Sequence, residues 1–173
     1  MSHLEHEQLA SEAQANIRCG VITISDTRTE ANDTSGALIR ELLAAHGHTV
    51  LRSQVIKDEP AQIVGLIAEL AASGCQTIIT SGGTGIAARD TTFEAVDGLL
   101  QKRLPGFGEI FRMLSYQEIG PAAMLSRATA GTIGDTLIFC LPGSSNAVRL
   151  GMEKLIVPEL SHLVWEIFRH KGR

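Results

Sequence analysis

Thr77-Ile78-Ile79-Thr80-Ser81-Gly82-Gly83-Thr84-Gly85 is the most informative segment of the chain, because a short apolar run leads into a loop with three glycines and hydroxyl side chains. The apolar half is typical of a strand buried on both faces of a sheet. Glycine lets a ligand approach the backbone closely, and successive backbone N–H groups in such a loop can hold an anion. In open α/β sheets, ligands bind at the carboxyl ends of the strands. The segment therefore predicts a binding loop at that edge of a sheet.

The glycine loop fits neither of the two common phosphate-binding motifs. A Walker A loop continues into Lys-Ser or Lys-Thr, and no lysine directly follows Gly85. The dinucleotide fingerprint needs Gly-x-Gly-x-x-Gly, a spacing that Gly82, Gly83 and Gly85 do not have. A plain strand-to-helix turn is the structural alternative, but one glycine would be enough for it. The loop therefore indicates an anion or a nucleotide without identifying which.

The composition is typical of a globular protein and argues against several classes of partner. Hydrophobic residues make up 44% and charged residues 20% of the 173 positions, which is enough for a full core. The net charge of −4 and the 4% of aromatic residues argue against a nucleic-acid-binding surface. No apolar run is long enough for a membrane span, and the polar first sixteen residues lack the apolar part of a signal peptide. We expect a cytoplasmic protein with an N-terminal arm (residues 1–16) and a single domain (residues 17–173).

Cysteines and histidines give no sign of a metal centre. Cys19, Cys75 and Cys140 are far apart, and we interpret them as small buried side chains in a reducing compartment. The six histidines do not form the H-E-x-x-H spacing of a zinc site.

Strand and helix patterns alternate along the chain. Apolar runs predict strands at residues 17–24, 50–56, 77–80, 129–133 and 136–141. One helical pattern follows a cap at residues 33–35, and a second starts at Pro60. Two more cover residues 92–100 and residues 110–119, the latter after a turn at residues 105–109. Two helices close the chain, and Pro158 starts the last one. This order predicts an α/β fold with three layers, a mostly parallel sheet with helices on both faces, and a short antiparallel hairpin at Gly134-Asp135.

Four loops are expected to meet at one edge of this sheet. They are Ser25-Asp26-Thr27, Lys57-Asp58-Glu59-Pro60, the glycine loop with Arg89-Asp90, and Pro142-Gly143-Ser144. Two carboxylates, Asp58 and Asp90, are then expected beside the anion loop. Carboxylates next to phosphate make sense if Mg²⁺ bridges them, because Mg²⁺ prefers a few carboxylates together with substrate phosphates. Each aspartate alone could be only a helix cap. Their joint position beside the glycine loop favours a functional site.

Some side chains keep two interpretations. The stripe of Leu160, Leu163, Val164 and Ile167, with Trp165 and Phe168, indicates either core or a subunit interface. Lys57 and Arg89 are the cations nearest to the loops in sequence, or solvated surface charges. Glu109 lies near a helix start, where an acidic residue is routine. Ser126-Arg127 is a ligand contact or the entry to a strand.

Six stretches of the sequence resemble the MoaB/MogA family of molybdenum-cofactor biosynthesis proteins, closer to MoaB. They are residues 20–26, 55–59, 80–85 with 89–92, 104–109, 123–127 and 141–144. These stretches occur in family order and span nearly the whole chain after residue 16, and their combination is highly specific.

The resemblance implies a molybdopterin-binding fold and an adenylyltransferase activity. Molybdopterin and ATP, with Mg²⁺, would give adenylylated molybdopterin and pyrophosphate. It implies metal binding and catalysis by Asp58 and Asp90. It implies ligand binding by Ser25, Asp26, Ser81, Gly82, Gly83, Thr84, Gly85, Pro142, Gly143 and Ser144. It also implies a homo-oligomer, either a trimer or a dimer of trimers. A non-catalytic protein that binds molybdopterin as a scaffold of the same pathway is the alternative.

Overall fold

The computed structural model describes residues 16–169, so the arm expected over residues 1–16 lies almost wholly outside the described residues. The centre is a six-stranded sheet in the order β2-β1-β3-β6-β5-β4. Its strands are β1 (Arg18–Ile24), β2 (Thr49–Ile56), β3 (Thr77–Ser81), β4 (Lys102–Arg103), β5 (Thr129–Ile133) and β6 (Thr136–Leu141). The first three pairings are parallel, and β5 and β4 are antiparallel to their neighbours. The mostly parallel sheet with an antiparallel hairpin is confirmed.

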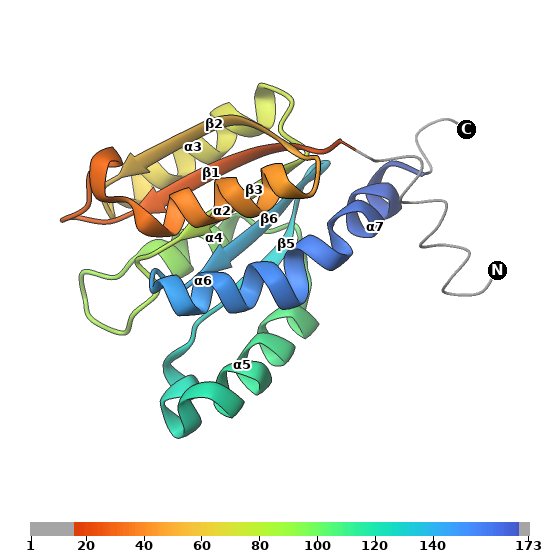
Figure 1. Cartoon of the computed structure of the whole chain (residues 1–173). Coiled ribbons are helices and arrows are strands. Elements are labelled where there is room, and N and C mark those ends of the chain that lie inside the picture. Colours follow the sequence, from red (N-terminus) through yellow and green to blue (C-terminus); the bar gives the residue numbers. More distant parts are fainter. Residues whose placement is uncertain (1–15, 170–173) are drawn as a thin grey trace.

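Helices cover both faces of this sheet (Figure 1). One face is covered by α2 (Thr34–Ala45), α5 (Pro105–Ile119), α6 (Ser145–Gly151) and α7 (Val157–Phe168). The other face is covered by α3 (Pro60–Ala72) and α4 (Thr92–Leu99). Short helical segments are η1 (Glu30–Asn32), η2 (Gly120–Leu125) and the π-helical η3 (Met152–Ile156), which joins α6 to α7. No helix in the described part of the chain is both long and apolar enough to cross a membrane.

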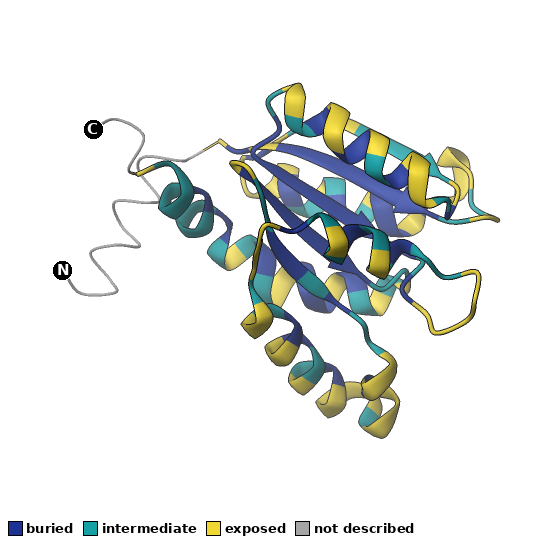
Figure 2. Cartoon of the chain, turned by 180° about the vertical axis from the view of Figure 1, so that it is seen from behind, coloured by how far each residue is buried: buried dark blue, intermediate teal, exposed yellow. Residues whose placement is uncertain are grey.

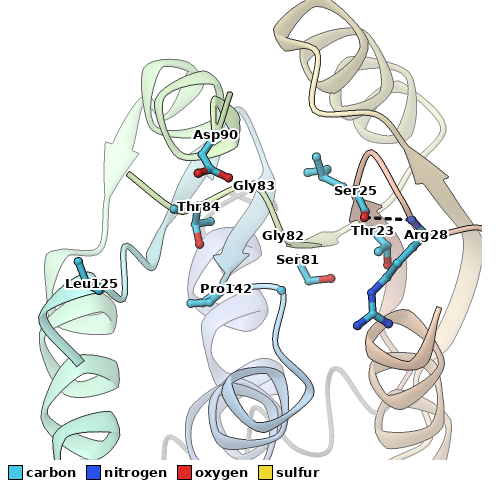
Figure 3. Close-up of a pocket in the computed structure, with 13 residues that line it drawn as sticks. Thr23, Ser25, Arg28, Ser81, Gly82, Gly83, Thr84, Asp90, Leu125 and Pro142 are labelled. Carbon is cyan, nitrogen blue, oxygen red and sulfur yellow. Dashed lines mark hydrogen bonds between the residues drawn. The ribbon is translucent and has the colours of Figure 1, made fainter. Parts of the chain in front are cut away.

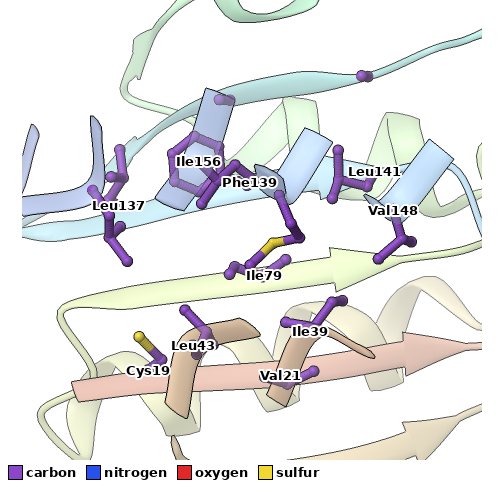
Figure 4. Close-up of a cluster of buried hydrophobic side chains, with 14 of the residues drawn as sticks. Cys19, Val21, Ile39, Leu43, Ile79, Leu137, Phe139, Leu141, Val148 and Ile156 are labelled. Atoms are coloured by element: carbon purple, nitrogen blue, oxygen red, sulfur yellow. The ribbon is translucent and has the colours of Figure 1, made fainter. Parts of the chain in front are cut away.

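Successive side chains of β3 belong to two different hydrophobic clusters. Ile79 packs in the cluster between the sheet and helices α2, α6 and α7 (Figure 4), whereas Ile78 packs in the cluster beneath α3 and α4. Both side chains are fully buried. Because neighbouring side chains of a strand point to opposite faces, a strand with helices on both sides is buried at every position and does not alternate between apolar and polar residues. This explains the adjacent isoleucines, Ile78 and Ile79, before the glycine loop.

The last apolar stripe of the sequence is core. Leu160 and Val164 of α7 are fully buried in the first cluster, and Leu163 and Ile167 pack against it. Figure 2 shows that α5, by contrast, has many exposed residues along its outer side. The interface interpretation of the terminal stripe is therefore not needed to account for its apolar residues.

The structure differs from the sequence predictions mainly in two helix starts and one missed strand. Helix α5 begins at Pro105, so the predicted turn at residues 105–109 is its first helical turn. Proline suits the first helical position, where the missing N–H has no intrahelical partner anyway. Helix α7 begins at Val157, as a continuation of α6 through η3. The two-residue strand β4 has no sequence signal and forms by pairing with Gly131 and Thr132 of β5.

The strand order places a crevice at the ends of β1 and β3. From β1 the chain passes through α2 to β2, and then through α3 back across β1 to β3. Helix α2, which follows β1, and helix α4, which follows β3, lie on opposite faces of the sheet. The loops after β1 and β3 therefore leave the sheet in opposite directions, which is the switch point where open α/β sheets bind ligands.

Candidate functional site

A cavity of about 410 Å³ opens at the carboxyl ends of β1, β3 and β6 (Figure 3). The predicted residues in its lining are Ser25, Ser81, Gly82, Gly83, Thr84, Gly85, Asp90, Pro142 and Gly143. The fold thus brings three of the four predicted loops to one cavity. Asp26, Asp58 and Ser144 do not line it.

At each glycine of the loop, a larger residue would clash with neighbouring atoms of the protein. Gly82 and Gly83 have φ angles of 104° and 63°, in the region that favours glycine. A Cβ atom on Gly82 would lie 2.1 Å from the Ile24 carbonyl oxygen, and one on Gly83 would lie 2.0 Å from the Thr92 hydroxyl. A Cβ on Gly85 would lie 2.5 Å from an Asp90 carboxylate oxygen. The density of glycines is therefore required by the packing of the loop itself.

The loop still offers donors to a ligand. The Gly82 N–H donates to the Leu141 carbonyl at 3.0 Å, so it is used within the protein. The N–H groups of Gly83, Thr84 and Gly85 have no acceptor among residues 16–169. The Ser81 hydroxyl is fully buried and has no hydrogen-bond partner in the same described region. Buried polar groups nearly always have a hydrogen-bond partner, so a ligand oxygen here would supply the acceptor that these groups lack.

Arg127 holds the backbone of this loop. Its Nε donates to the Thr84 carbonyl at 2.9 Å, and its Nη2 donates to the Gly85 carbonyl. The guanidinium also pairs with Glu94 and lies 4.9 Å from the Phe93 ring centroid. In a trans peptide the N–H points away from the C=O. Arg127 fixes two carbonyls, so the N–H group of each of these peptide units points away from it. Arg127 thereby positions the backbone of the loop.

Among the described residues, Asp90 is the only carboxylate in the cavity lining. One of its oxygens, Oδ2, accepts from the Ala87 N–H at 3.1 Å. The other, Oδ1, has no partner within residues 16–169, and the side chain is half-buried. This free oxygen is available to a cation bound in the cavity.

Asp58 lies behind the glycine loop rather than in the cavity. Its side chain is 4% exposed and accepts from the Thr91 N–H at 3.3 Å, from the Thr91 hydroxyl at 2.7 Å and from the Thr92 hydroxyl at 3.2 Å. A Cβ on Gly83 would lie 2.2 Å from its Oδ2. Helix α4 has no side-chain cap from its own N-cap residue, Thr91. Asp58 therefore caps this helix from the end of β2, which satisfies an otherwise unpaired N–H group.

Asp26 joins the three loops to one another. Its two carboxylate oxygens accept from Arg89 Nε at 2.7 Å and Nη2 at 2.9 Å, and Arg89 Nη1 lies 2.8 Å from Glu59 Oε1. The hydrogen bonds from Arg89 lower the pKa of Asp26 below its ordinary value. The Asp26 carboxylate therefore points to Arg89, and the ion pairs tie the glycine loop to the ends of β1 and β2.

The loop after β6 is fixed by two serines. The Ser35 hydroxyl of α2 donates to the Gly143 carbonyl at 2.9 Å. The Ser144 hydroxyl accepts from the Ala147 N–H at 3.2 Å and is the N-cap of α6. Ser144 is thus placed as a cap, while Pro142 and Gly143 face the cavity.

Sequence reasoning missed Arg28, the only positively charged side chain that the described part of the chain contributes to the lining. Its backbone N–H donates to the Ser25 hydroxyl at 3.1 Å, the bond drawn in Figure 3. Its Nη1 donates to the Asn32 carbonyl at 3.2 Å and to the Thr34 hydroxyl at 2.7 Å. The one sequence signal was its place in the polar loop after β1. Lys57, Glu109 and Ser126 lie outside the lining.

The donor set suits Mg²⁺ only in part. Within residues 16–169 no group of three or more His, Cys, Asp or Glu side chains could hold a metal ion. Mg²⁺ usually takes one or two carboxylates and completes its shell with water and substrate phosphate. Asp90 fits that role through its free oxygen. Asp58 already accepts several hydrogen bonds and lies behind Gly83, so it fits less well.

Comparisons with known proteins agree with this architecture. Residues 20–162 match the family described as "Probable molybdopterin binding domain". The chain is 50% identical over 171 residues to molybdenum cofactor biosynthesis protein B of Bacillus anthracis, covering 98% of this chain and 99% of the relative.

Solved structures give the same result. A crystal structure of a molybdenum cofactor biosynthesis protein B superposes with a TM-score of 0.87 at 50% identity, covering 90% of this chain and 98% of that one. The molybdopterin biosynthesis enzyme MoaB of Thermus thermophilus superposes with a TM-score of 0.79 at 38% identity, covering 91% and 98%. With sequence, fold and cavity in agreement, this chain belongs to the MoaB family of molybdenum cofactor biosynthesis proteins and has their molybdopterin-binding fold.

Proposed function

We propose that this chain binds molybdopterin in the cavity at the ends of β1, β3 and β6 and transfers AMP to it from ATP. The observation that carries the proposal is the pairing of anion donors with one carboxylate. The free N–H groups of Gly83, Thr84 and Gly85 lie in the same cavity as Asp90. A carboxylate beside a phosphate is repulsive unless a cation lies between them. A metal-bound triphosphate meets both requirements.

The reaction needs positioning more than proton transfer. An oxygen of the terminal phosphate of molybdopterin attacks the α-phosphorus of ATP, the bond from that phosphorus to the bridging oxygen breaks, and pyrophosphate leaves. The nucleophile is already an anion, so no general base is needed, and no histidine of residues 16–169 lines the cavity. Bound Mg²⁺ would neutralise charge on the leaving phosphates. The protein supplies alignment of the two reactants and fixed N–H dipoles.

Detection of the adenylylated product tests this proposal. The protein is incubated with molybdopterin, ATP and Mg²⁺, and the products are separated by chromatography. Asp90→Asn should lose most of the transfer. Asp97→Asn is the matched control, because Asp97 pairs with Arg103 outside the cavity. If the unchanged protein binds molybdopterin tightly but forms no product, the non-catalytic scaffold becomes the better explanation.

We also propose that the chain is a cytoplasmic homo-oligomer, a trimer or a dimer of trimers. Exposed apolar side chains on α5 and η2 support self-association: Met113, Tyr116 and Met124 are 55–77% exposed and line one surface hollow. Contiguous exposed apolar patches of this kind mark interaction surfaces in soluble proteins. Sedimentation at micromolar concentration measures the state directly, and a monomer alone would rule the proposal out.

A further inference from the structure

We propose that Arg28 and Ser81 form a second anion subsite in this cavity, which binds the phosphate monoester of the pterin substrate without a metal ion. The inference rests on the proposed function and assigns one side of the cavity to the nucleophile. The other side, with Asp90 and the free N–H groups of the loop, is left for the triphosphate.

The first observation is the state of the Arg28 guanidinium. Its Nη1 is anchored on the Asn32 carbonyl and the Thr34 hydroxyl, while Nε and Nη2 have no acceptor among residues 16–169. Arg28 has no ion pair within this described region, whereas Arg89 and Arg127 are both paired with carboxylates. An anchored guanidinium with free donors is pre-organised to bind phosphate.

The second observation is the buried Ser81 hydroxyl. Ser81 ends β3, is 0% exposed and lines the cavity, yet its hydroxyl has no partner in the described part of the chain. A hydroxyl that is buried without a partner is rare, and a ligand oxygen at this point would satisfy it. The Ser81 hydroxyl is thus a fixed hydrogen-bond donor that remains available to a ligand.

The third observation is the separation of opposite charges. In Figure 3, Asp90 lies on the side of Gly83 and Thr84, whereas Arg28 lies on the side of Thr23 and Ser25. A phosphate near Asp90 needs a cation between them, but a phosphate near Arg28 does not. Holding two phosphate groups on two sides of one cavity brings the attacking oxygen of one towards the α-phosphorus of the other.

The experiment measures equilibrium binding of molybdopterin and of its dephosphorylated form. Arg28→Gln should weaken molybdopterin binding about 10- to 100-fold, as expected for loss of a charge-assisted hydrogen bond, and leave the dephosphorylated form unchanged. Ser81→Ala should act in the same direction, about 10-fold. Arg40→Gln is the matched control, because Arg40 is also half-buried and donates from Nη1 to a hydroxyl, that of Ser53, outside this cavity. The KM for ATP should not change in these variants.

The outcomes separate this inference from the proposed function. Equal loss of affinity for both pterins in Arg28→Gln, or a rise in the KM for ATP instead, would overturn the subsite. The unchanged protein could prefer molybdopterin to its dephosphorylated form, lose that preference in Arg28→Gln, and yet transfer no AMP. This result would support the subsite and contradict the transferase proposal. If Arg28→Gln does not fold, Arg28→Lys is the second variant: it keeps the charge but loses the anchored guanidinium with its free Nε and Nη2 donors, so it should retain only part of the discrimination. A folded lysine variant with the full discrimination of the unchanged protein would overturn the role of the anchored guanidinium.

Discussion

Replacing Asp58 by asparagine should destabilise the fold by a predictable amount. The Asp58 carboxylate accepts from the Thr91 N–H, the Thr91 hydroxyl and the Thr92 hydroxyl. Asparagine keeps one oxygen, loses the charge and presents an NH₂ group to donors. Charge-assisted hydrogen bonds are worth about 1 kcal/mol more than neutral ones, so three weakened bonds cost about 2–3 kcal/mol. For a chain of this size, that corresponds to a Tm lowered by about 4–12 °C.

Replacing Asp90 by asparagine should leave stability nearly unchanged and remove catalysis. Asp90 accepts one hydrogen bond, from the Ala87 N–H, and an asparagine oxygen can accept it equally well. The Tm should therefore shift by no more than about 2 °C. If Asp90 holds the cation at the triphosphate, AMP transfer should fall by about 10²–10³.

Calorimetry and the AMP-transfer assay, run on both variants, test this contrast. The transfer assay uses saturating ATP and Mg²⁺, and Asp97→Asn serves as the control for a general effect of losing an aspartate. An unchanged Tm in Asp58→Asn would refute the capping role derived from its three hydrogen bonds. Near-normal turnover in Asp90→Asn would remove that aspartate from the mechanism.

Three further variants test the stability of the fold and its pH dependence. Gly83→Ala should destabilise the protein by more than about 2 kcal/mol in urea unfolding, because its φ is 63° and a Cβ atom there overlaps α4. Gly65→Ala in α3, with no described atom within 4 Å of the new Cβ, should stabilise it by about 0.5–1 kcal/mol. Burial lowers the pKa of His48 below 6.5, so the folded state keeps this histidine neutral while the unfolded state binds a proton. The free energy of unfolding should therefore fall as pH drops below about 6.5, and His48→Gln should flatten that slope in urea titrations at several pH values. A steeper slope in the variant, or an alanine at position 65 as harmful as one at 83, would contradict these expectations.

The sequence predicted the sheet and most of the cavity because the signals are local. A strand buried on both faces is rich in apolar residues without alternation, and a loop at a strand end carries glycine and hydroxyl residues. The start of α5 was missed because Pro105-Gly106 has the composition of a turn, although proline also suits a first helical turn. Strand β4 was missed because two residues have no periodicity, and only the pairing with β5 defines them.

Arg28 could not be found from the sequence because nothing local distinguishes it. It is one of 15 Lys and Arg residues and stands in a polar loop without a motif. Its place in the site arises from the turn that its N–H forms with the Ser25 hydroxyl and from the anchor on the Thr34 hydroxyl. Such contacts depend on how the loop after β1 folds back to α2, which pattern analysis does not provide.

The glycine loop shows a different limit. Sequence analysis took the density of glycines as a sign of a ligand, but Gly82 and Gly83 are required by the Ile24 carbonyl and the Thr92 hydroxyl inside the protein. The evidence for a ligand is instead the set of donors that the described chain leaves unpaired, above all the buried Ser81 hydroxyl. The prediction of a binding loop was thus based on a feature that packing alone explains.

For Asp58, the helix cap and the functional role are consistent with each other. Asp58 fixes Thr91 and Thr92 at the start of α4, and the Thr92 N–H in turn donates to the Gly83 carbonyl at 3.1 Å. The orientation of that carbonyl sets the direction of the next N–H group, that of Thr84, which is one of the free donors of the loop. A carboxylate at the end of β2 therefore controls an anion-binding group that it does not touch. It follows that Asp58→Asn should weaken phosphate binding together with stability, whereas Asp90→Asn should spare stability.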